Sequence, residues 1–208
     1  MAAREAKLES IRSNIIQAAR VYSSSLSGKI FMYVFGNEYF EVLFATDRFV
    51  HLTGVATQLG AQDFYDKAKD GILTTRQFYF SERHTYGNAK KKLPCLISLP
   101  DITNSLVCVV KDLSTMTLTY KLGVTNLSFT LGLTPNVDLN GNKINDWYLP
   151  RTLRVKDKAI ENSAFSEFVD FIFVRDASAS SYSTLAFSSK DRSIPPSLRG
   201  LVDDSFFG

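Results

Sequence analysis

Two short runs of aromatic and β-branched residues that lead straight into a helical pattern constrain the fold of this chain most. Residues 29–35 and 39–44 have the composition of β-strands, and the glycine-asparagine pair between them favours a hairpin turn. Residues 49–55 follow, and residues 61–69 then have helical spacing. The chain has two histidines, and one of them, His51, falls inside this connection. The sequence therefore predicts a strand-to-helix junction that carries a titratable imidazole.

Residues 3–22, ahead of the hairpin, form the clearest helical pattern in the chain. Apolar residues recur there at spacings of three and four, while the charged residues fall mostly on the other side. The serine-rich segment that ends at Gly28 stops the helix. Packing of this helix on its own domain is favoured over membrane binding, because its apolar stripe is narrow and its charges are mixed.

Further strands are expected after the junction, so the chain is predicted to be an α+β protein. A second short helix is expected at residues 72–80, whereas the proline-punctuated residues 86–99 are ambiguous. Strands are expected at residues 106–112, 117–122, 127–133, 168–174 and 182–187, with turns at Ser114-Thr115, Thr125-Asn126 and Asn140-Gly141. The expected organisation is an N-terminal amphipathic helix at residues 1–27, one α+β domain at residues 28–190 and an irregular tail at residues 191–208.

The composition is that of an ordinary globular protein and excludes few functions. The chain has 208 residues, which fits one domain, and a net charge of +3, which permits a polyanionic partner without requiring one. Cys95 and Cys108 stand in apolar runs and are expected to be free thiols. The sequence has no run of about 18 apolar residues that would span a membrane. The N-terminus lacks the apolar core of a secretory signal, so a cytoplasmic location is expected.

The chain lacks the motifs that mark common nucleotide, flavin and metal sites. It has no phosphate-binding glycine loop, no HExxH, no GxSxG and no histidine-cysteine cluster at metal spacing. No cofactor and no metal are therefore predicted. RNA cleavage needs neither, because the 2′-hydroxyl of the substrate itself attacks the adjacent phosphate. The protein then has to supply a base, an acid and a cation that stabilises the developing charge.

The catalytic candidates come from two parts of the chain. His51 leads them, because the ordinary pKa of an imidazole suits either proton transfer, and Thr53 follows two residues later. Arg175 ends one strand of the last expected pair, and Tyr182 and Thr184 begin the other. Antiparallel pairing would bring these ends together, so that they could contact one phosphate.

The RNA-binding candidates form a basic cluster with an interleaved tyrosine, as RNA-binding surfaces often do. They are Arg83, His84, Lys90, Lys91 and Lys92. Each of these signals also has an ordinary structural explanation. A histidine in apolar surroundings is often half-buried with satisfied partners, and a lysine run is often the solvated face of a helix.

Residues 31–55 resemble the opening of the phage-type branch of the barnase/EndoU/colicin/RelE-like nuclease superfamily. In that branch two strands lead into a Phe-x-His-Leu-Thr-Gly signature, which this chain has at residues 49–54. The layout that follows is also similar, with Phe64-Tyr65 in the next helix, several strands and a closing strand pair. The resemblance covers residues 28–190, and only the signature is specific.

The resemblance implies a barnase/RelE-like α+β fold, in which N-terminal helices pack on a twisted, mainly antiparallel sheet. It implies metal-independent RNA cleavage in a phage or mobile element, where such domains act as toxins or effectors. His51 would be the general acid or base, and Thr53 would orient it or touch phosphate. Arg175 would stabilise the pentacoordinate phosphate, with Tyr182 or Thr184 contacting it.

An alternative follows from one gap in this pattern. No acidic residue adjoins His51 in a way that guarantees a second proton carrier. A protein that keeps the nuclease fold without its activity, and that binds or inhibits a host complex, therefore stays open. The expected partners are RNA and a host or antitoxin protein.

Overall fold

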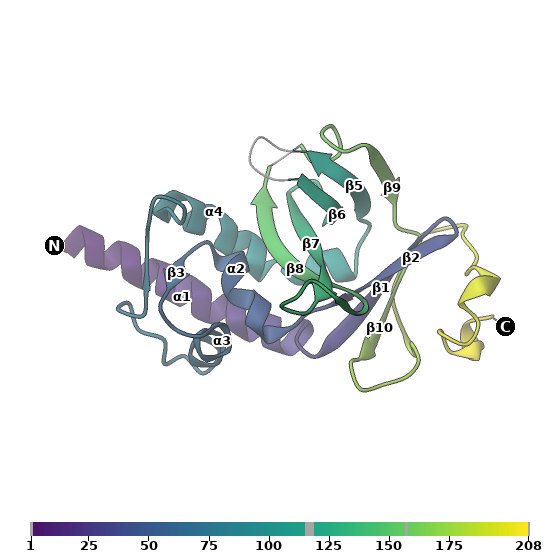
Figure 1. Ribbon diagram of the computed structural model, residues 1–208, viewed down its shortest axis with the longest axis horizontal. Coiled ribbons are helices and arrows are strands. Elements are labelled where there is room, and N and C mark those ends of the chain that lie inside the picture. The colour runs from purple at the N-terminus through teal and green to yellow at the C-terminus, as the bar shows by residue number, and fades with distance from the viewer. Residues whose placement is uncertain (1, 115–118, 157, 208) are drawn as a thin grey trace.

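The computed structural model describes residues 2–114, 119–156 and 158–207 and confirms the α+β class. Helices gather towards the N-terminal end and pack on one face of a curled nine-stranded sheet, while the C-terminal segment lies at the opposite end (Figure 1). The helices are α1 (Ala2–Ser25), α2 (Phe49–Thr53), α3 (Ala61–Lys69) and α4 (Tyr86–Ile97), and the 3-10 helices are η1 (Thr46–Arg48), η2 (Leu99–Thr103), η3 (Pro196–Leu198) and η4 (Asp204–Phe207). The large sheet contains β1 (Lys29–Phe35), β2 (Glu38–Leu43), β5 (Cys108–Ser114), β6 (Thr119–Thr125), β7 (Phe129–Val137), β8 (Lys143–Val155), β9 (Phe165–Phe168), β10 (Phe171–Asp176) and β11 (Thr184–Ser188), and a separate pair is formed by β3 (Ala56–Thr57) and β4 (Phe78–Tyr79).

Neighbouring strands of the large sheet follow the order β11-β10-β1-β2-β8-β7-β6-β5-β9. They pair antiparallel except for β2 and β8, which run parallel and meet at the single pair Val42 and Tyr148. The predicted first hairpin is confirmed, since Phe35 pairs with Glu38 across the turn. Gly36 in that turn has a φ of +55°, a conformation that glycine adopts without strain. The sheet is therefore mainly antiparallel, as predicted.

The sheet curls so far that its β9 edge returns to the turn between β1 and β2. The ring of Phe165 in β9 lies 6.3 Å from the ring of Phe35 in β1. The ammonium group of Lys111 lies 5.0 Å from the ring centre of Phe35 and 4.7 Å from that of Phe165. It also forms an ion pair with Glu38. These contacts join strands that are far apart in the sheet order.

Both faces of the sheet are covered, because side chains alternate along each strand. On β1, Phe31 packs with the apolar residues of the helices, and Met32 packs on the opposite face. That opposite face is covered by the C-terminal segment, whose Leu198 and Val202 are buried there. The tail that was expected to be an irregular arm thus contains two short 3-10 helices and packs on the sheet.

The helix expected at residues 72–80 is wrong. Gly71 has a φ of +79°, and the segment after it turns and then forms β4. The backbone groups of this segment have partners other than a helix, since the Arg12 guanidinium donates to the carbonyls of Gly71 and Leu73. The side chain of Gln77 also accepts from the backbone N–H of Thr74, at 2.8 Å. Long-range and turn hydrogen bonds therefore override the apolar spacing.

The ambiguous residues 86–99 contain α4 and the beginning of η2. The Thr85 hydroxyl accepts a hydrogen bond from the Asn88 N–H at 3.2 Å and caps α4, which continues through Pro94. The three consecutive lysines therefore lie on a helix, where Lys90 and Lys91 are exposed and Lys92 is partly buried.

The later strands confirm part of the expectation and extend it. β5, β6 and β7 occur near the expected positions, and Asn140-Gly141 forms the turn between β7 and β8. The thirteen-residue β8 and the four-residue β9 were not predicted, and the strand expected at residues 168–174 corresponds to β10. The turn expected at Ser114-Thr115 extends outside the described residues.

Candidate functional site

His51 is the one residue of α2 that faces solvent. The other four residues of this short helix are buried and anchor it against the core. α2 begins directly after η1 and packs against α3, α4 and β8. The local sequence thus fixes a helical turn by its apolar residues and leaves one imidazole at the surface.

Thr53 and Gly54 end this turn and allow α4 to approach. Thr53 is fully buried, and its hydroxyl donates to the Val50 carbonyl at 2.7 Å and accepts from the Val55 N–H at 3.3 Å. Gly54 has a φ of +79°, and a Cβ atom there would lie 3.1 Å from Cδ of Lys92. The Thr53 hydroxyl is therefore engaged by backbone groups, and it holds the end of the helix that carries His51.

The electrostatic environment of His51 favours a neutral imidazole. Partial burial lowers the pKa of His51 below its usual value of 6.5, and the positive charge of Arg48 lowers it further. Asp47 opposes this effect, while His84 adds to the lowering. His51 is thus expected to be mostly unprotonated at neutral pH and able to accept a proton.

His84 lies in the loop before α4 and is held by Ser81. The backbone N–H of Ser81 donates to the His84 carbonyl at 3.0 Å, and the N–H of His84 donates to the Ser81 carbonyl at 3.2 Å. The Ser81 hydroxyl lies 3.3 Å from Nδ1 of His84. This loop brings the second histidine of the chain close enough to His51 for their charges to interact.

Lys92 extends the positive cluster along α4. Burial lowers the pKa of the Lys92 ammonium, and the positive charge of Arg154 on β8 lowers it further. Arg48 and Arg154 were not singled out from the sequence. Arg48 is only three residues from His51 and could have been found by proximity, whereas Arg154 reaches the cluster through β8, which the sequence did not predict. Arg83, Lys90 and Lys91 are exposed beside this cluster.

The closing-strand candidates form a second cluster. The expected proximity of Arg175 and Tyr182 is present, since the guanidinium carbon lies 5.1 Å from the tyrosine ring centre. Both side chains contact Glu41, with the Tyr182 hydroxyl donating to Oε1 at 2.5 Å and an Arg175 nitrogen 3.5 Å from the same oxygen. Burial and the bond to Glu41 raise the pKa of Tyr182 above its usual value, which keeps its hydroxyl a donor.

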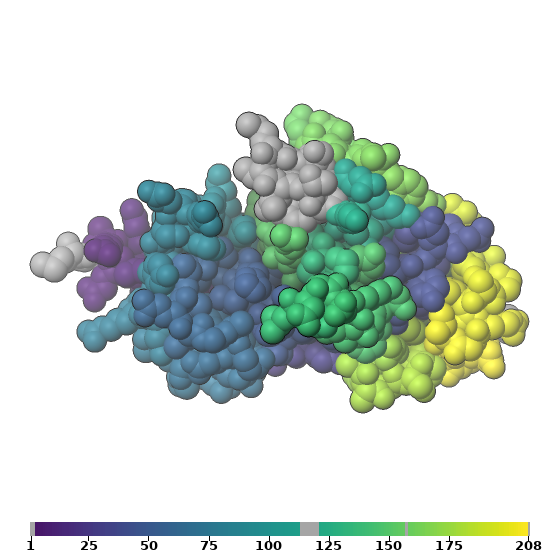
Figure 2. All heavy atoms as spheres, in the orientation of Figure 1, coloured from purple at the N-terminus to yellow at the C-terminus, as the bar shows by residue number. Residues whose placement is uncertain are grey.

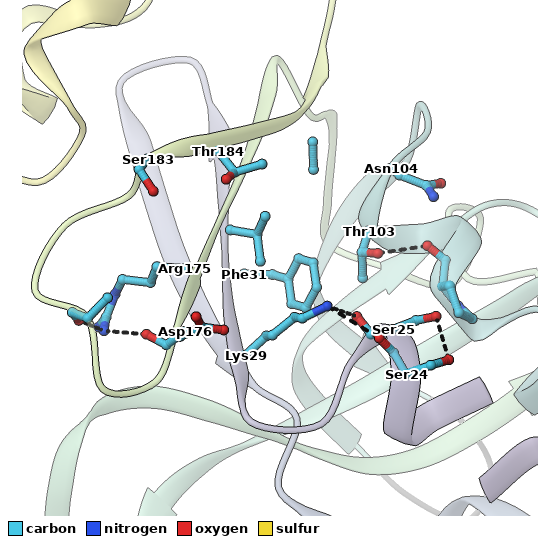
Figure 3. A pocket seen from close by; sticks show the side chains of 14 residues that line it. Ser24, Ser25, Lys29, Phe31, Thr103, Asn104, Arg175, Asp176, Ser183 and Thr184 are labelled. Atoms are coloured by element: carbon cyan, nitrogen blue, oxygen red, sulfur yellow. Dashed lines mark hydrogen bonds between the residues drawn. The ribbon is translucent and has the colours of Figure 1, made fainter. Parts of the chain in front are cut away.

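Thr184 lines a cavity to which Arg175 also contributes. Thr184 pairs with Val174 on β10, and the cavity, of about 520 Å³, lies between the end of α1, η2 and the strands β1, β10 and β11. Figure 3 shows Lys29, Phe31 and Thr184 around this cavity, and Arg175 also lines it, with its guanidinium donating to the Ala179 carbonyl. The ammonium of Lys29 is engaged by the carbonyls of Ser24 and Ser25.

The two groups of catalytic candidates are not brought together. Arg175 is opposite Ile30 in the pairing of β10 with β1, and the Ile30 side chain belongs to the face covered by the C-terminal segment. The buried residues of α2 belong to the cluster on the helix side. His51 therefore lies near the charges of Arg48, Asp47 and His84, with Lys92 against the neighbouring Gly54. Arg175 instead has Tyr182, Glu41 and Trp147 around it.

Two further features of the described residues concern ions and membranes. Within residues 2–114, 119–156 and 158–207, no three histidine, cysteine, aspartate or glutamate side chains gather in a way that could hold a metal ion. The same part of the chain has no helix with the length and apolar character needed to cross a bilayer.

Comparison with known proteins bears on the identity of the fold. A search of curated proteins and a search of solved structures each found no match. A protein-family model described as phage-Barnase-EndoU-ColicinE5/D-RelE like nuclease4 matches residues 14–191. This match includes the histidine signature, α3, α4 and all strands of the large sheet, and it ends where the C-terminal segment begins. The chain therefore belongs to the phage-Barnase-EndoU-ColicinE5/D-RelE like nuclease4 family, a family of phage-associated nucleases.

Proposed function

We propose that this protein is an endoribonuclease that cleaves RNA without a metal ion, with His51 and His84 as its proton-transfer groups. The observation that carries the proposal is that the charges of Arg48 and of His84, which is 33 positions away in the sequence, both act on the exposed imidazole of His51. Family membership supports nuclease activity. The second histidine also supplies the proton carrier that the residues adjacent to His51 lack.

The proposed reaction assigns one task to each group. The neutral His51 imidazole takes the proton of the 2′-hydroxyl, and the 2′-oxygen forms a bond to the adjacent phosphorus. The bond from phosphorus to the 5′-oxygen breaks, and protonated His84 gives its proton to that oxygen. Arg48 and Lys92 stabilise the negative charge on the phosphate oxygens in the transition state. The products are a 2′,3′-cyclic phosphate and a 5′-hydroxyl.

Ser81 and Thr53 have supporting tasks in this scheme. The Ser81 hydroxyl next to Nδ1 orients the His84 ring and leaves the other ring nitrogen for the substrate. Thr53 fixes the end of α2 and with it the position of His51. Arg83, Lys90 and Lys91 are exposed beside the cluster, where they would bind backbone phosphates of the RNA.

Cleavage of RNA in EDTA by the purified protein tests the proposal. His51→Ala and His84→Ala are each expected to lower the rate by about 10²–10⁴-fold, the usual contribution of a general acid or base. Lys92→Ala is expected to lower it by about 10²-fold through lost charge stabilisation. Lys121→Ala, which changes an exposed lysine on β6, is the matched control and is expected to retain full activity.

The product ends and the folded state decide between the outcomes. Cyclic phosphate ends and unchanged melting temperatures in the histidine variants would support the mechanism. Full activity in His51→Ala would contradict the role of His51. A folded wild-type protein that binds RNA or a host protein but does not cleave RNA would favour the non-catalytic alternative.

A further inference from the structure

A cavity of about 550 Å³ opens where β2 and β8 separate. The two strands share one residue pair, Val42 with Tyr148, and diverge from there towards the β1–β2 turn and the β7–β8 hairpin. The cavity fills this divergence, and none of the residues assigned to the His51 cluster lines it. Its lining consists of Tyr39, Phe40, Glu41, Pro135, Val137, Lys143, Asp146, Trp147 and Tyr148.

Aromatic side chains give the cavity flat apolar walls. Tyr39 stands on β2 and is 44% exposed, while Trp147 and Tyr148 stand on β8 and are partly buried. The Arg175 guanidinium carbon lies 5.6 Å from the Trp147 ring centre and holds that ring in place. Unpaired nucleobases are bound in proteins by stacking on such aromatic surfaces.

Glu41 lines the cavity, and only one of its two carboxylate oxygens is bound by Tyr182 and Arg175. Oε1 of Glu41 accepts the hydrogen bond of the Tyr182 hydroxyl and lies near Arg175. Oε2 of Glu41 accepts no hydrogen bond from the described residues, and the Glu41 side chain is 18% exposed. A carboxylate oxygen is an acceptor only, so its partner in a ligand has to be an N–H or O–H donor.

We propose that this cavity binds an unpaired nucleobase that carries an amino group, with the base stacked on the aromatic walls and the amino group donating to Oε2 of Glu41. The proposal rests on the proposed function in one respect, because the base would belong to the RNA that is cleaved at the His51 cluster. Arg175 and Tyr182 act as positioning residues that hold Glu41 and Trp147.

The location of the cavity suits an extended RNA strand. β8 carries Trp147 at the cavity and Arg154 near Lys92 of α4, and seven residues of strand span about 23 Å at about 3.3 Å per residue. Figure 2 shows the β7–β8 hairpin and the α2–α3 region next to each other on one face of the molecule. A base in the cavity would therefore lie a few nucleotides from the phosphate that is cleaved.

Cytidine and uridine discriminate the proposal most sharply, because they differ only at the edge that faces Glu41. Cytosine presents an amino donor at N4, whereas uracil presents a carbonyl oxygen there, which the carboxylate repels, and has its N–H donor at N3 instead. A single hydrogen bond to a charged group changes affinity by at least about tenfold. Cytidine is expected to bind more tightly than uridine by that factor.

Trp147 reports on the cavity directly, because it is the single tryptophan of the chain. Titration of each nucleoside into the full-length protein, followed by tryptophan fluorescence, measures the two dissociation constants. In Glu41→Gln, the Tyr182 hydroxyl holds the amide oxygen and the amide nitrogen takes the place of Oε2. A donor then replaces the free acceptor, so the preference for cytidine is expected to vanish or reverse.

Two tyrosines provide a matched pair of variants. Tyr39→Ala removes a wall of the cavity and is expected to weaken the binding of both nucleosides, whereas Tyr79→Ala changes a similarly exposed tyrosine on β4 and is expected to have no effect. Saturable quenching that is equal for the two nucleosides, or no quenching, would overturn the proposal. Quenching by cytidine in a protein that does not cleave RNA would leave the cavity assignment standing and refute the nuclease activity. Cleavage of RNA without quenching by either nucleoside would support the nuclease activity and refute the cavity assignment.

Discussion

His51 and Arg175 lie on opposite sides of the central sheet. α2 is anchored in the core on the helix side, and the Arg175 side chain packs on the face that the C-terminal segment covers. The two residues have different surroundings as well, since His51 is exposed and only 11% of the Arg175 side chain is accessible to solvent. Substitutions at these positions are therefore expected to have different effects, on catalysis in one case and on stability in the other.

Arg175→Met is expected to destabilise the fold. The substitution leaves the partly buried Glu41 carboxylate with Tyr182 alone and removes the cation from the Trp147 ring, which should cost about 3 kcal/mol. Urea unfolding measures the loss. Arg192→Ala is the control, because Arg192 is exposed and its ion pair with Asp170 should contribute less than about 1 kcal/mol. An equal decrease in the free energy of unfolding in the two variants would show that the contacts of Arg175 stabilise the fold no more than an exposed ion pair does.

Gly54→Ala is expected to disturb the approach of α4 to α2. The positive φ of Gly54 costs a residue with a side chain about 1–2 kcal/mol, and the added Cβ would also press on Lys92 and on the backbone of Ala89. A lower melting temperature, together with reduced RNA cleavage, is the expected result. Gly87→Ala is the matched control inside α4, where a Cβ meets nothing closer than 3.9 Å. A neutral Gly54→Ala would indicate that the two helices are not closely packed here.

The pKa of His51 predicts how activity depends on pH. Because burial and Arg48 lower this pKa in the folded protein, the rate that needs neutral His51 should rise with pH with a midpoint below 6.5. NMR titration of His84→Ala, in which His51 is the single remaining imidazole, measures the pKa directly. Loss of the positive charge of His84 should move that pKa slightly towards 6.5. A midpoint above 6.5 in the wild-type protein would contradict the electrostatic assignment.

The same shift affects stability in a defined direction. The unfolded chain binds a proton at His51 more readily than the folded chain does, because the folded pKa is the lower one. This contribution to stability is therefore present above the unfolded pKa of about 6.5 and is lost as the pH falls through the interval between the two values. His51→Ala should show a smaller decrease in the free energy of unfolding over that interval.

Leu198→Ala tests whether the C-terminal segment is part of the folded domain. Leu198 is 2% exposed and packs on the sheet face that carries Met32 and Phe173. Loss of this side chain should lower the free energy of unfolding by about 2–5 kcal/mol, as for other buried leucines. Ile72→Ala, at a position that is 62% exposed, should change it little. A small effect at Leu198 would mean that the segment contributes little to stability.

Local sequence patterns were sufficient for the elements whose contacts are mainly local. α1 and α3 follow from helical spacing, and the β1–β2 and β10–β11 pairs follow from strand composition next to short turns. The position of His51 at a strand-to-helix junction also follows from the sequence, because the apolar residues around it have to be buried. These features depend on which residues alternate or recur, and the sequence contains that information directly.

The tertiary structure alone decided which candidate residues meet. Gly54 lets α4 pack against α2, which brings Lys92 against the end of the helix that carries His51, and the charge of His84 acts on His51. Arg154 comes near Lys92 on a strand that the sequence did not predict. Arg175 and Tyr182 contact each other as expected, but the alternation of side chains in β10 places Arg175 on the far face of the sheet. Long-range pairing such as that of β2 with β8 depends on contacts between residues about a hundred positions apart. No local pattern encodes such contacts, because they depend on the packing of the whole core.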